Sequence, residues 1–186
     1  MRILAIDPGN THSGWVIIDS HTRRPLQIDK SPNELVLDHC YGDLQWDTAV
    51  IEMIASYGMA VGREVFDTCI WIGRFTEAIK THTEIYKPNK TLDQALTYTV
   101  RQTVKLHHCH TIKAKDANII QALIDRFTPG QPNRGKGTKA NPGWFYGFKA
   151  DIWQAYALAV QHADQLEADT ARDVLPGVPA REQVVA

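Results

Sequence analysis

Short apolar runs that end in turn residues mark the first third of the chain. The run from Arg2 to Asp7 predicts a buried strand, and the run from Gly14 to Asp19 predicts its antiparallel partner beyond a Pro-Gly-Asn turn. A weaker strand is predicted from Pro25 to Ile28, after which Ser31 is expected to cap a helix. Thr48 to Met53 predicts a central strand. The chain is therefore expected to open with a hairpin and to continue the same sheet.

Helical periodicity follows in the middle of the chain. From Gly62 to about His82, apolar residues recur on two sides of one helix, so its own sheet and a second subunit are expected to cover it. Leu96 to Val100 predicts a strand, whereas residues 116–127 predict a helix with Asp116 as its N-cap. Thr128 to Gly147 contains five glycines and three prolines, which predicts a long mobile loop. Asp151 to about Ala168 predicts the last helix.

The order of these elements, with strands first and helices later, predicts an α/β fold in which helices flank a mixed central sheet. A chain of 186 residues with 44% hydrophobic residues supports one domain, expected over residues 1–168, with a flexible tail at 169–186. No apolar run reaches the roughly 20 residues of a membrane span, and the start lacks a signal peptide. The three cysteines have no metal-ligand spacing. A cytoplasmic protein without a membrane partner is expected.

Charge is distributed unevenly along the chain. Residues 101–149 contain nine Lys or Arg and two acidic residues, a local charge of +7, and the whole chain has a net charge of −1, which leaves −8 for the remainder. This asymmetry fits a basic surface that faces phosphates, and it equally fits a solvated charged face. The basic loop at 134–139 lacks the strand and helix context of a nucleotide-binding loop, so flexible contacts to a nucleic-acid backbone are favoured.

Three acidic residues stand where predicted elements begin or end. Asp7 ends the first strand but could equally form the turn, and Asp151 begins the last helix, where it could simply favour the helix dipole. Glu52 ends an apolar strand, where a charge needs a partner or a metal to offset its desolvation. If the three converge, their oxygens suit Mg²⁺ or Mn²⁺. Two such ions about 4 Å apart would activate water beside a phosphodiester and stabilise the leaving oxygen.

Four ordered blocks resemble the RuvC-type Holliday junction resolvases, in particular their phage-type members, over residues 3 to about 160. The blocks are ILAIDPG and SGW within 3–15, IEMIASYGM at 51–59, KDAN and QALIDRF within 115–127, and NPG and YG within 141–147. The resemblance implies a ribonuclease H-like fold, two divalent metal ions, a homodimer, and paired incisions that resolve branched DNA. A crossover junction endodeoxyribonuclease without a small-molecule cofactor, in the cytoplasm of a bacterial or phage-infected cell, is therefore expected.

The resemblance also assigns the residues of the site. The family's first aspartate matches Asp7, its strand-end glutamate matches Glu52, and the first residue of its C-terminal acidic pair matches Asp151. The second residue of that pair is here an uncharged amide, Gln154, so either Asp151 alone serves this side or Asp116 adds a ligand. Contacts to DNA are expected from a further set of residues: Tyr57, Arg74, Lys105, Lys115, Arg134, Lys136, Lys139 and Lys149.

Other functions compete with this interpretation. The amide at Gln154 leaves open a junction-binding protein that has lost catalysis. The segment from Asp7 to Thr11 also resembles the first phosphate motif of actin and sugar-kinase ATPases, but those proteins enclose ATP between two domains, for which 186 residues leave no room. The segment from His107 to His110 invites a zinc site, yet adjacent ligands lack the usual loop spacing. Incision of DNA in the presence of Mg²⁺ separates an enzyme from a binding protein.

Overall fold

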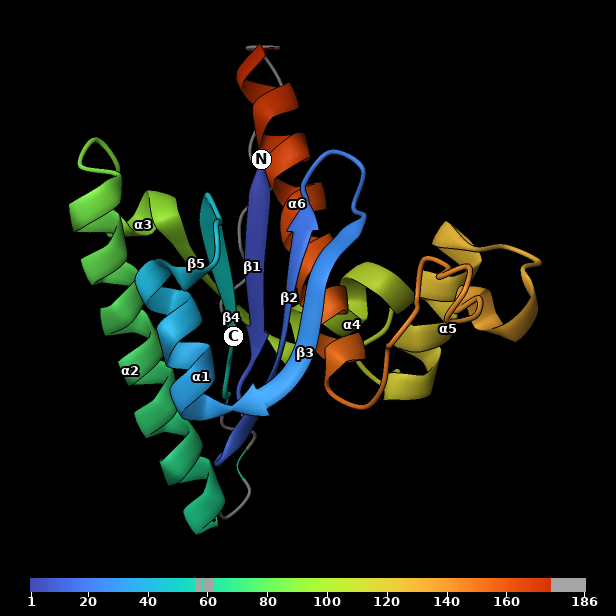
Figure 1. Ribbon diagram of the computed structural model, residues 1–186, viewed down its shortest axis with the longest axis horizontal. Coiled ribbons are helices and arrows are strands. Elements are labelled where there is room, and N and C mark those ends of the chain that lie inside the picture. The colour runs from blue at the N-terminus through green and yellow to red at the C-terminus, as the bar shows by residue number, and fades with distance from the viewer. Residues whose placement is uncertain (56–57, 59–61, 175–186) are drawn as a thin grey trace.

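A five-stranded mixed sheet with helices on both faces forms the protein in a computed structural model, which describes residues 1–55, 58 and 62–174 (Figure 1). The strand order is β3-β2-β1-β4-β5. Strand β1 pairs antiparallel with β2 and parallel with β4, and β5 continues the parallel half. The strands are β1 (Arg2–Asp7), β2 (His12–Asp19), β3 (Pro25–Pro32), β4 (Thr48–Met53) and β5 (Leu96–Val100). The predicted α/β class and the opening hairpin are confirmed.

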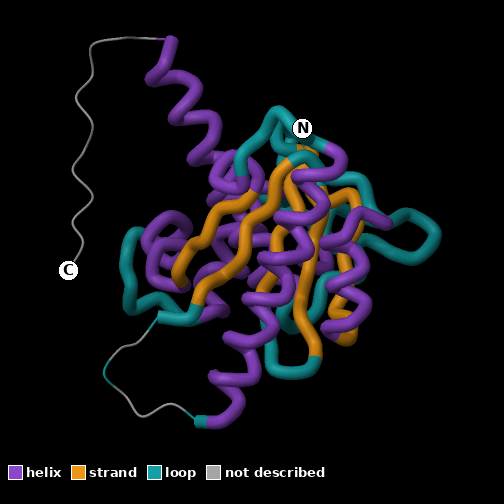
Figure 2. Tube along the Cα trace, turned by 90° about the vertical axis from the view of Figure 1, so that its left-hand side faces the viewer, coloured by secondary structure: helices purple, strands orange, loops and turns teal. Residues whose placement is uncertain are grey.

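Alternating side chains of β1 serve two separate hydrophobic cores. Ile3 and Ala5 face one core, and Leu4 and Ile6 face the other, because successive residues of a strand point to opposite faces. Helices α1 (Asn33–Asp38) and α2 (Arg63–Tyr86) cover one face of the sheet, as Figures 1 and 2 show. The other face packs against α4 (Arg101–Cys109), α5 (Asp116–Phe127) and α6 (Ile152–Val174). Shorter turns of helix are α3 (Leu92–Ala95), η1 (His39–Asp43) and η2 (Pro132–Gly135).

Two of the predicted helix caps are wrong. Helix α1 begins after Pro32, because β3 continues through that residue and the Ser31 hydroxyl accepts a hydrogen bond from the indole of Trp15. Helix α5 has Lys115 as its N-cap, and Asp116 is the first helical residue. The backbone N–H of Lys115 donates to the side chain of Asn118, so the cap is closed without Asp116. The carboxylate of Asp116 is thereby available for another partner.

The apolar residues of α2 lie on two sides of the helix, but they are distributed between these sides differently from the prediction. The buried stripe combines Ile72, Phe75 and Ile79, because these three share one face at helical spacing. Phe66 and Ile70, on the outer side, are 59% and 62% exposed. The second apolar side is therefore real, and none of the residues that the structure describes covers it.

The later part of the chain departs from the prediction in three places. Helices α3 and α4 were not predicted, although they flank the confirmed strand β5. The loop at 128–147 contains the turn η2 and a bridge between Gly137 and Pro142, and it inserts Phe145 into the core. Helix α6 continues to Val174, so residues 169–174 are helical, and a flexible tail stays a prediction for 175–186, which lie outside the described residues.

Candidate metal centre

Two of the predicted carboxylates lie at the same edge of the sheet. Asp7 is the last residue of β1, and Glu52 is the residue before the last of β4. The two strands are parallel, with Ile6 paired to Ile51, so Asp7 and Glu52 follow in adjacent positions. Parallel strands carry their carboxyl ends to one edge, and here that edge presents two acidic side chains beside each other.

Asp151 reaches the same place through a close contact with β2. Gly14 is paired with Asp7 across the hairpin, and a Cβ added at Gly14 would lie only 2.7 Å from the backbone carbonyl carbon of Asp151. Only glycine allows this approach, because any side chain would overlap the backbone. Asp151, the residue directly before α6, is thus seated on the strand neighbour of Asp7.

The carboxylates at this edge repel one another. Burial raises the pKa of Asp7 well above its ordinary value, and the negative charge of Glu52 raises it further. Asp151 and Asp116 act in the same direction, whereas Arg101 opposes them. Asp7 therefore lies at the centre of a group of like charges, which disfavours its ionised form.

Two cations that sequence reasoning did not place in the site hold the outer carboxylates. The guanidinium of Arg101 donates to Glu52, with Nη1 and Oε2 3.1 Å apart, and to Asp116, with Nη2 and Oδ1 2.7 Å apart. On the other side, the ammonium of Lys30 lies 2.5 Å from Oδ2 of Asp151. A cavity of about 210 Å³ is lined by Asp7, Glu52 and Arg101. Among the described residues, no three His, Cys, Asp or Glu side chains are gathered closely enough to hold a metal ion.

Gln154 supplies a further oxygen on this side of the molecule. It lies three residues after Asp151, which places both on one face of the helix start. The residue is 7% exposed, and its Oε1 has no hydrogen-bond partner among the described residues. A buried acceptor without a partner is costly, so this atom is suited to a cation that brings the missing interaction.

The donor set as a whole fits a divalent cation in its chemistry. Asp7, Glu52 and Asp151 offer carboxylate oxygens, and Gln154 offers a neutral one, which is the oxygen-rich combination that Mg²⁺ and Mn²⁺ prefer. Glu52 would have to release Arg101, and Asp151 would have to release Lys30, before either could turn fully toward a metal. The arrangement is thus a group of acidic residues held by internal cations.

The side chains predicted to contact DNA differ in their exposure and in whether they already bind another group. Arg74 is exposed and stacks on the ring of Trp71 at 4.0 Å, and half-buried Lys105 lowers the pKa of Glu52 by its charge, although burial raises that pKa more. Lys136 is half-buried and donates from Nζ to the carbonyl oxygen of Phe148 at 2.8 Å. Tyr57 lies outside the described residues. The remaining four are exposed: Lys115, Arg134, Lys139 and Lys149.

A signal for Arg101 was present in the sequence. It follows directly after the predicted strand 96–100, and that strand is parallel to β4, so Arg101 leaves the sheet at the edge that carries Glu52. The strand order had to be known before this could be used. Lys30 offered less, because the weak third strand was predicted to end before it.

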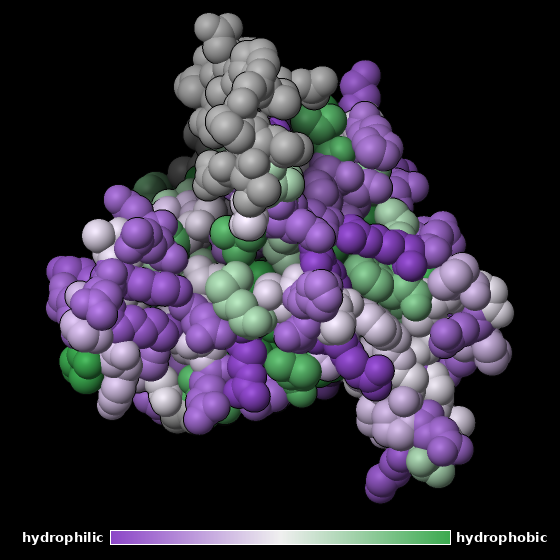
Figure 3. Space-filling model, turned by 90° about the horizontal axis from the view of Figure 1, so that it is seen from above, coloured by the Kyte–Doolittle hydropathy of each residue, from purple (hydrophilic) through white to green (hydrophobic). Residues whose placement is uncertain are grey.

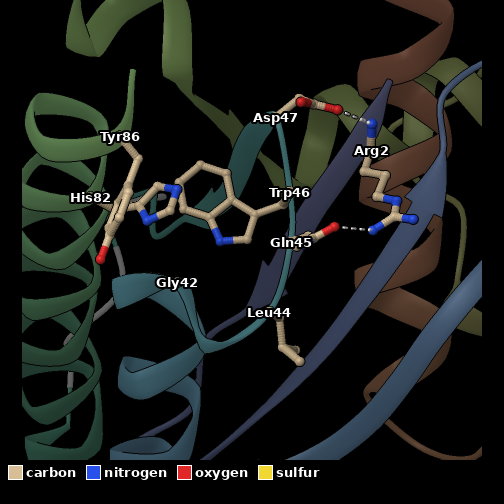
Figure 4. A pocket seen from close by; sticks show the side chains of 8 residues that line it. All are labelled: Arg2, Gly42, Leu44, Gln45, Trp46, Asp47, His82 and Tyr86. Atoms are coloured by element: carbon tan, nitrogen blue, oxygen red, sulfur yellow. Dashed lines mark hydrogen bonds between the residues drawn. The ribbon is translucent and has the colours of Figure 1, made fainter. Parts of the chain in front are cut away.

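The opposite end of the sheet, where β1 begins, holds larger hollows without such chemistry. Seen from above, that end is mostly hydrophilic with separate small apolar areas (Figure 3). A cavity of about 450 Å³ there is lined by Arg2, Trp46 and His82 among others (Figure 4). Several of its polar groups are already paired, since Arg2 donates to Gln45 and to Asp47. The smaller cavity at Asp7 is therefore the better candidate site.

Similarity to known proteins is found in structure and not in sequence. No protein-family model matches the chain, and no curated protein does. Two similar solved structures are those of Thermus thermophilus RuvC, one alone and one in complex with a Holliday junction substrate; each has a TM-score of 0.58 and 13% identity and covers 91% of this chain. The matches cover 98% and 97% of those RuvC chains. The chain therefore has the fold of these RuvC structures, a mixed sheet flanked by helices of the ribonuclease H-like type.

Proposed function

We propose that this protein is a divalent-metal-dependent endonuclease that cuts branched DNA such as Holliday junctions. One observation carries the proposal: Asp7, Glu52 and the start of α6 at Asp151 meet at one edge of a sheet with the RuvC fold. Carboxylates that repel one another in a cleft are typical of functional sites, because their repulsion lowers the stability of the fold and serves no structural purpose.

The chain's own residues divide the work. Asp7 lies at the centre and would face both outer carboxylates, while Glu52 and Asp151 would hold the two sides. Divalent cations bound here would activate water and stabilise the leaving oxygen of a phosphodiester. The orphaned oxygen of Gln154 would complete the set without adding charge. No Ser or Cys nucleophile is required by this chemistry.

DNA binding would draw on the basic stretch of the chain. The exposed side chains of Lys115, Arg134, Lys139 and Lys149 can neutralise phosphates without demanding one geometry. Lys136 would contribute less, because its ammonium is bound to the Phe148 carbonyl. Contacts from Arg74, Lys105 and Tyr57 remain part of the proposal.

A homodimer fits paired incision, since a two-fold junction calls for two equivalent sites. The uncovered side of α2 carries Phe66 and Ile70, and a Cβ added at Gly73 would meet nothing within 4 Å, so a second helix could approach closely there. Sedimentation should show a dimer at micromolar concentration, and Phe66→Glu with Ile70→Glu should convert it to a monomer. A wild-type protein that sediments as a monomer, with and without DNA, would contradict this part.

The direct test is incision of a panel of branched DNAs by the full-length protein. Four-way junctions, forks and flaps are incubated with Mg²⁺, Mn²⁺ or EDTA, and Asp7→Asn serves as the matched control because it keeps the shape of the side chain. Metal-dependent cutting that Asp7→Asn abolishes is expected. Tight junction binding without any incision would instead support the alternative of a binding protein that has lost catalysis.

A further inference from the structure

Arg101 occupies an unusual place in the site. It is the first residue of α4 and follows Val100, which is paired with Met53, so the backbone brings Arg101 to the edge of the sheet that carries Glu52. One guanidinium nitrogen binds Glu52 and another binds Asp116. The side chains of Arg101 and Glu52 are only 21% and 15% exposed, whereas Asp116 is 58% exposed. The fork therefore joins an inner carboxylate to an outer one.

The surroundings of this fork are short of positive charge. Four carboxylates act on one another here, those of Asp7, Glu52, Asp116 and Asp151, and among the described residues the cations in direct contact with them are Arg101 and Lys30. A guanidinium stays protonated at any pH at which the protein is folded, so it cannot leave by losing its charge. An incoming metal ion and Arg101 must therefore compete for the oxygens of Glu52.

We propose that Arg101 is a positioning residue that acts as a resident counter-cation: it holds Glu52 in the metal-free protein and swings to Asp116 alone when a divalent cation binds. Asp116 is then the anchor that receives Arg101 and is not a metal ligand. This inference rests on the proposed function only in requiring that a cation binds at Asp7 and Glu52. It makes the affinity for metal lower, and the metal-free fold more stable, than the carboxylates alone would give.

The test measures binding of Mn²⁺ to the EDTA-treated, full-length protein, by calorimetry and by the electron paramagnetic resonance signal of the free ion. Arg101→Gln should bind Mn²⁺ about tenfold more tightly, since a competing unit charge in contact with a ligand has been removed. Lys105→Gln is the matched control: it removes the same charge from α4 at a residue that acts on Glu52 only through space, and its gain should be threefold or less.

Thermal unfolding provides a second measurement. Without metal, Arg101→Gln should melt below the wild type, and saturating Mn²⁺ should raise its melting temperature more than that of the wild type. Arg101→Lys keeps the charge but loses the fork, so its affinity should fall between the two. This variant also keeps the test decisive if Arg101→Gln does not fold.

The possible results distinguish failure of the counter-cation from failure of the proposed metal site. Equal or weaker Mn²⁺ binding by Arg101→Gln, at a site that Asp7→Asn abolishes, would overturn the counter-cation and leave the proposed function standing. Unchanged Mn²⁺ binding with weaker binding of junction DNA would show that Arg101 contacts phosphate instead. Mn²⁺ binding that Asp7→Asn does not affect would remove the metal site itself, and the proposed function with it.

Discussion

Two groups of charged residues on this molecule contain the same side-chain types in opposite balance. Asp164, on α6, receives hydrogen bonds from Arg23, Arg126 and His107, with Nη2 of Arg23 2.9 Å and Nη1 of Arg126 2.6 Å from its oxygens. Burial alone would raise the pKa of Asp164, but these hydrogen bonds lower it far below its ordinary value. At Asp7 the pKa is raised instead, by burial and by Glu52.

The difference separates a structural cluster from a candidate site. Around Asp164, three donors from the β2–β3 turn, α4 and α5 meet one carboxylate, so the charge is saturated and ties four elements together. Around Asp7, in the part of the chain that the structure describes, four carboxylates share two contacting cations. A surplus of negative charge has no structural benefit, and it leaves affinity for a further cation.

The largest expected difference is in incision. Asp7→Asn, Glu52→Gln and Asp151→Asn should each lower the rate on a four-way junction by about two orders of magnitude or more, through loss of metal-assisted water activation. Asp164→Asn should keep the rate within about threefold, since it touches only the structural cluster. The measurement is the initial rate of incision in Mg²⁺, at a temperature well below the melting temperature of each variant. Full activity in all three neutralised variants would end the nuclease interpretation at this site.

The next largest difference is in stability, and the two clusters should move in opposite directions. Asp164→Asn should lower the free energy of unfolding by about 3 kcal/mol, mainly because Arg23, whose side chain is 7% exposed, loses a partner that is itself 17% exposed. Asp7→Asn should raise it by about 1 kcal/mol in metal-free protein, since a buried, repelling charge is removed. Urea unfolding at pH 7 measures both.

A control for these two variants is Asp169→Asn. Asp169 accepts from Gln165 and Arg172 on the exposed surface of α6, where an ion pair contributes little. Its unfolding free energy should match that of the wild type within about 0.5 kcal/mol. If Asp7→Asn and Asp164→Asn shifted in the same direction, the proposed contrast between the clusters would be wrong.

The third expected difference is in pH dependence. The pKa of Asp164 is lower in the folded protein than in the unfolded chain, where it is about 3.9. The ionised carboxylate therefore contributes fully to the free energy of unfolding above about pH 3.9, and this contribution is lost as the pH falls below that value. The pKa of Asp7 is higher in the folded protein than in the unfolded chain. Ionisation of Asp7 therefore lowers the free energy of unfolding as the pH rises from about 3.9 to the pKa of the folded state. The advantage of metal-free Asp7→Asn over wild type should therefore shrink as the pH falls from 7 to 4. Urea unfolding along this range measures it, and a constant advantage would contradict the raised pKa.

Local patterns were sufficient for much of the fold. The strands at 2–7, 48–53 and 96–100 were predicted with the bounds that the structure gives, because short apolar runs between turn residues encode them directly. The caps at Ser31 and Asp116 failed, because Trp15 and Arg101 engage these side chains from distant parts of the chain. Tertiary contacts overrode local propensity at both places.

The same limit applies to the candidate site. Asp7, Glu52 and Asp151 were found because each marks the end or the start of an element, and the resemblance added the expectation that they converge. Arg101 and Lys30 could not be placed without the pairing of β5 with β4 and the extension of β3. Whether ions, DNA and a second subunit bind as expected stays a prediction, as does the cellular location; among the described residues, no helix is long and apolar enough to cross a membrane.

The smallest expected effect concerns Gln154, whose buried oxygen has no hydrogen-bond partner in the described part of the chain. Gln154→Glu keeps the shape of the side chain and adds a negative charge to a group that already has a surplus. The metal-free protein should lose about 1 kcal/mol of stability, and saturating Mn²⁺ should restore it, because the added charge is then a ligand. Incision should remain within about threefold of the wild-type rate or rise. Gln161→Glu, two turns further along α6 and equally buried at 7% exposure, is the matched control, since its neighbour is Thr99 and not a carboxylate. Its loss of stability should persist in Mn²⁺, whereas equal rescue of both variants would mean that the ion does not bind beside Gln154.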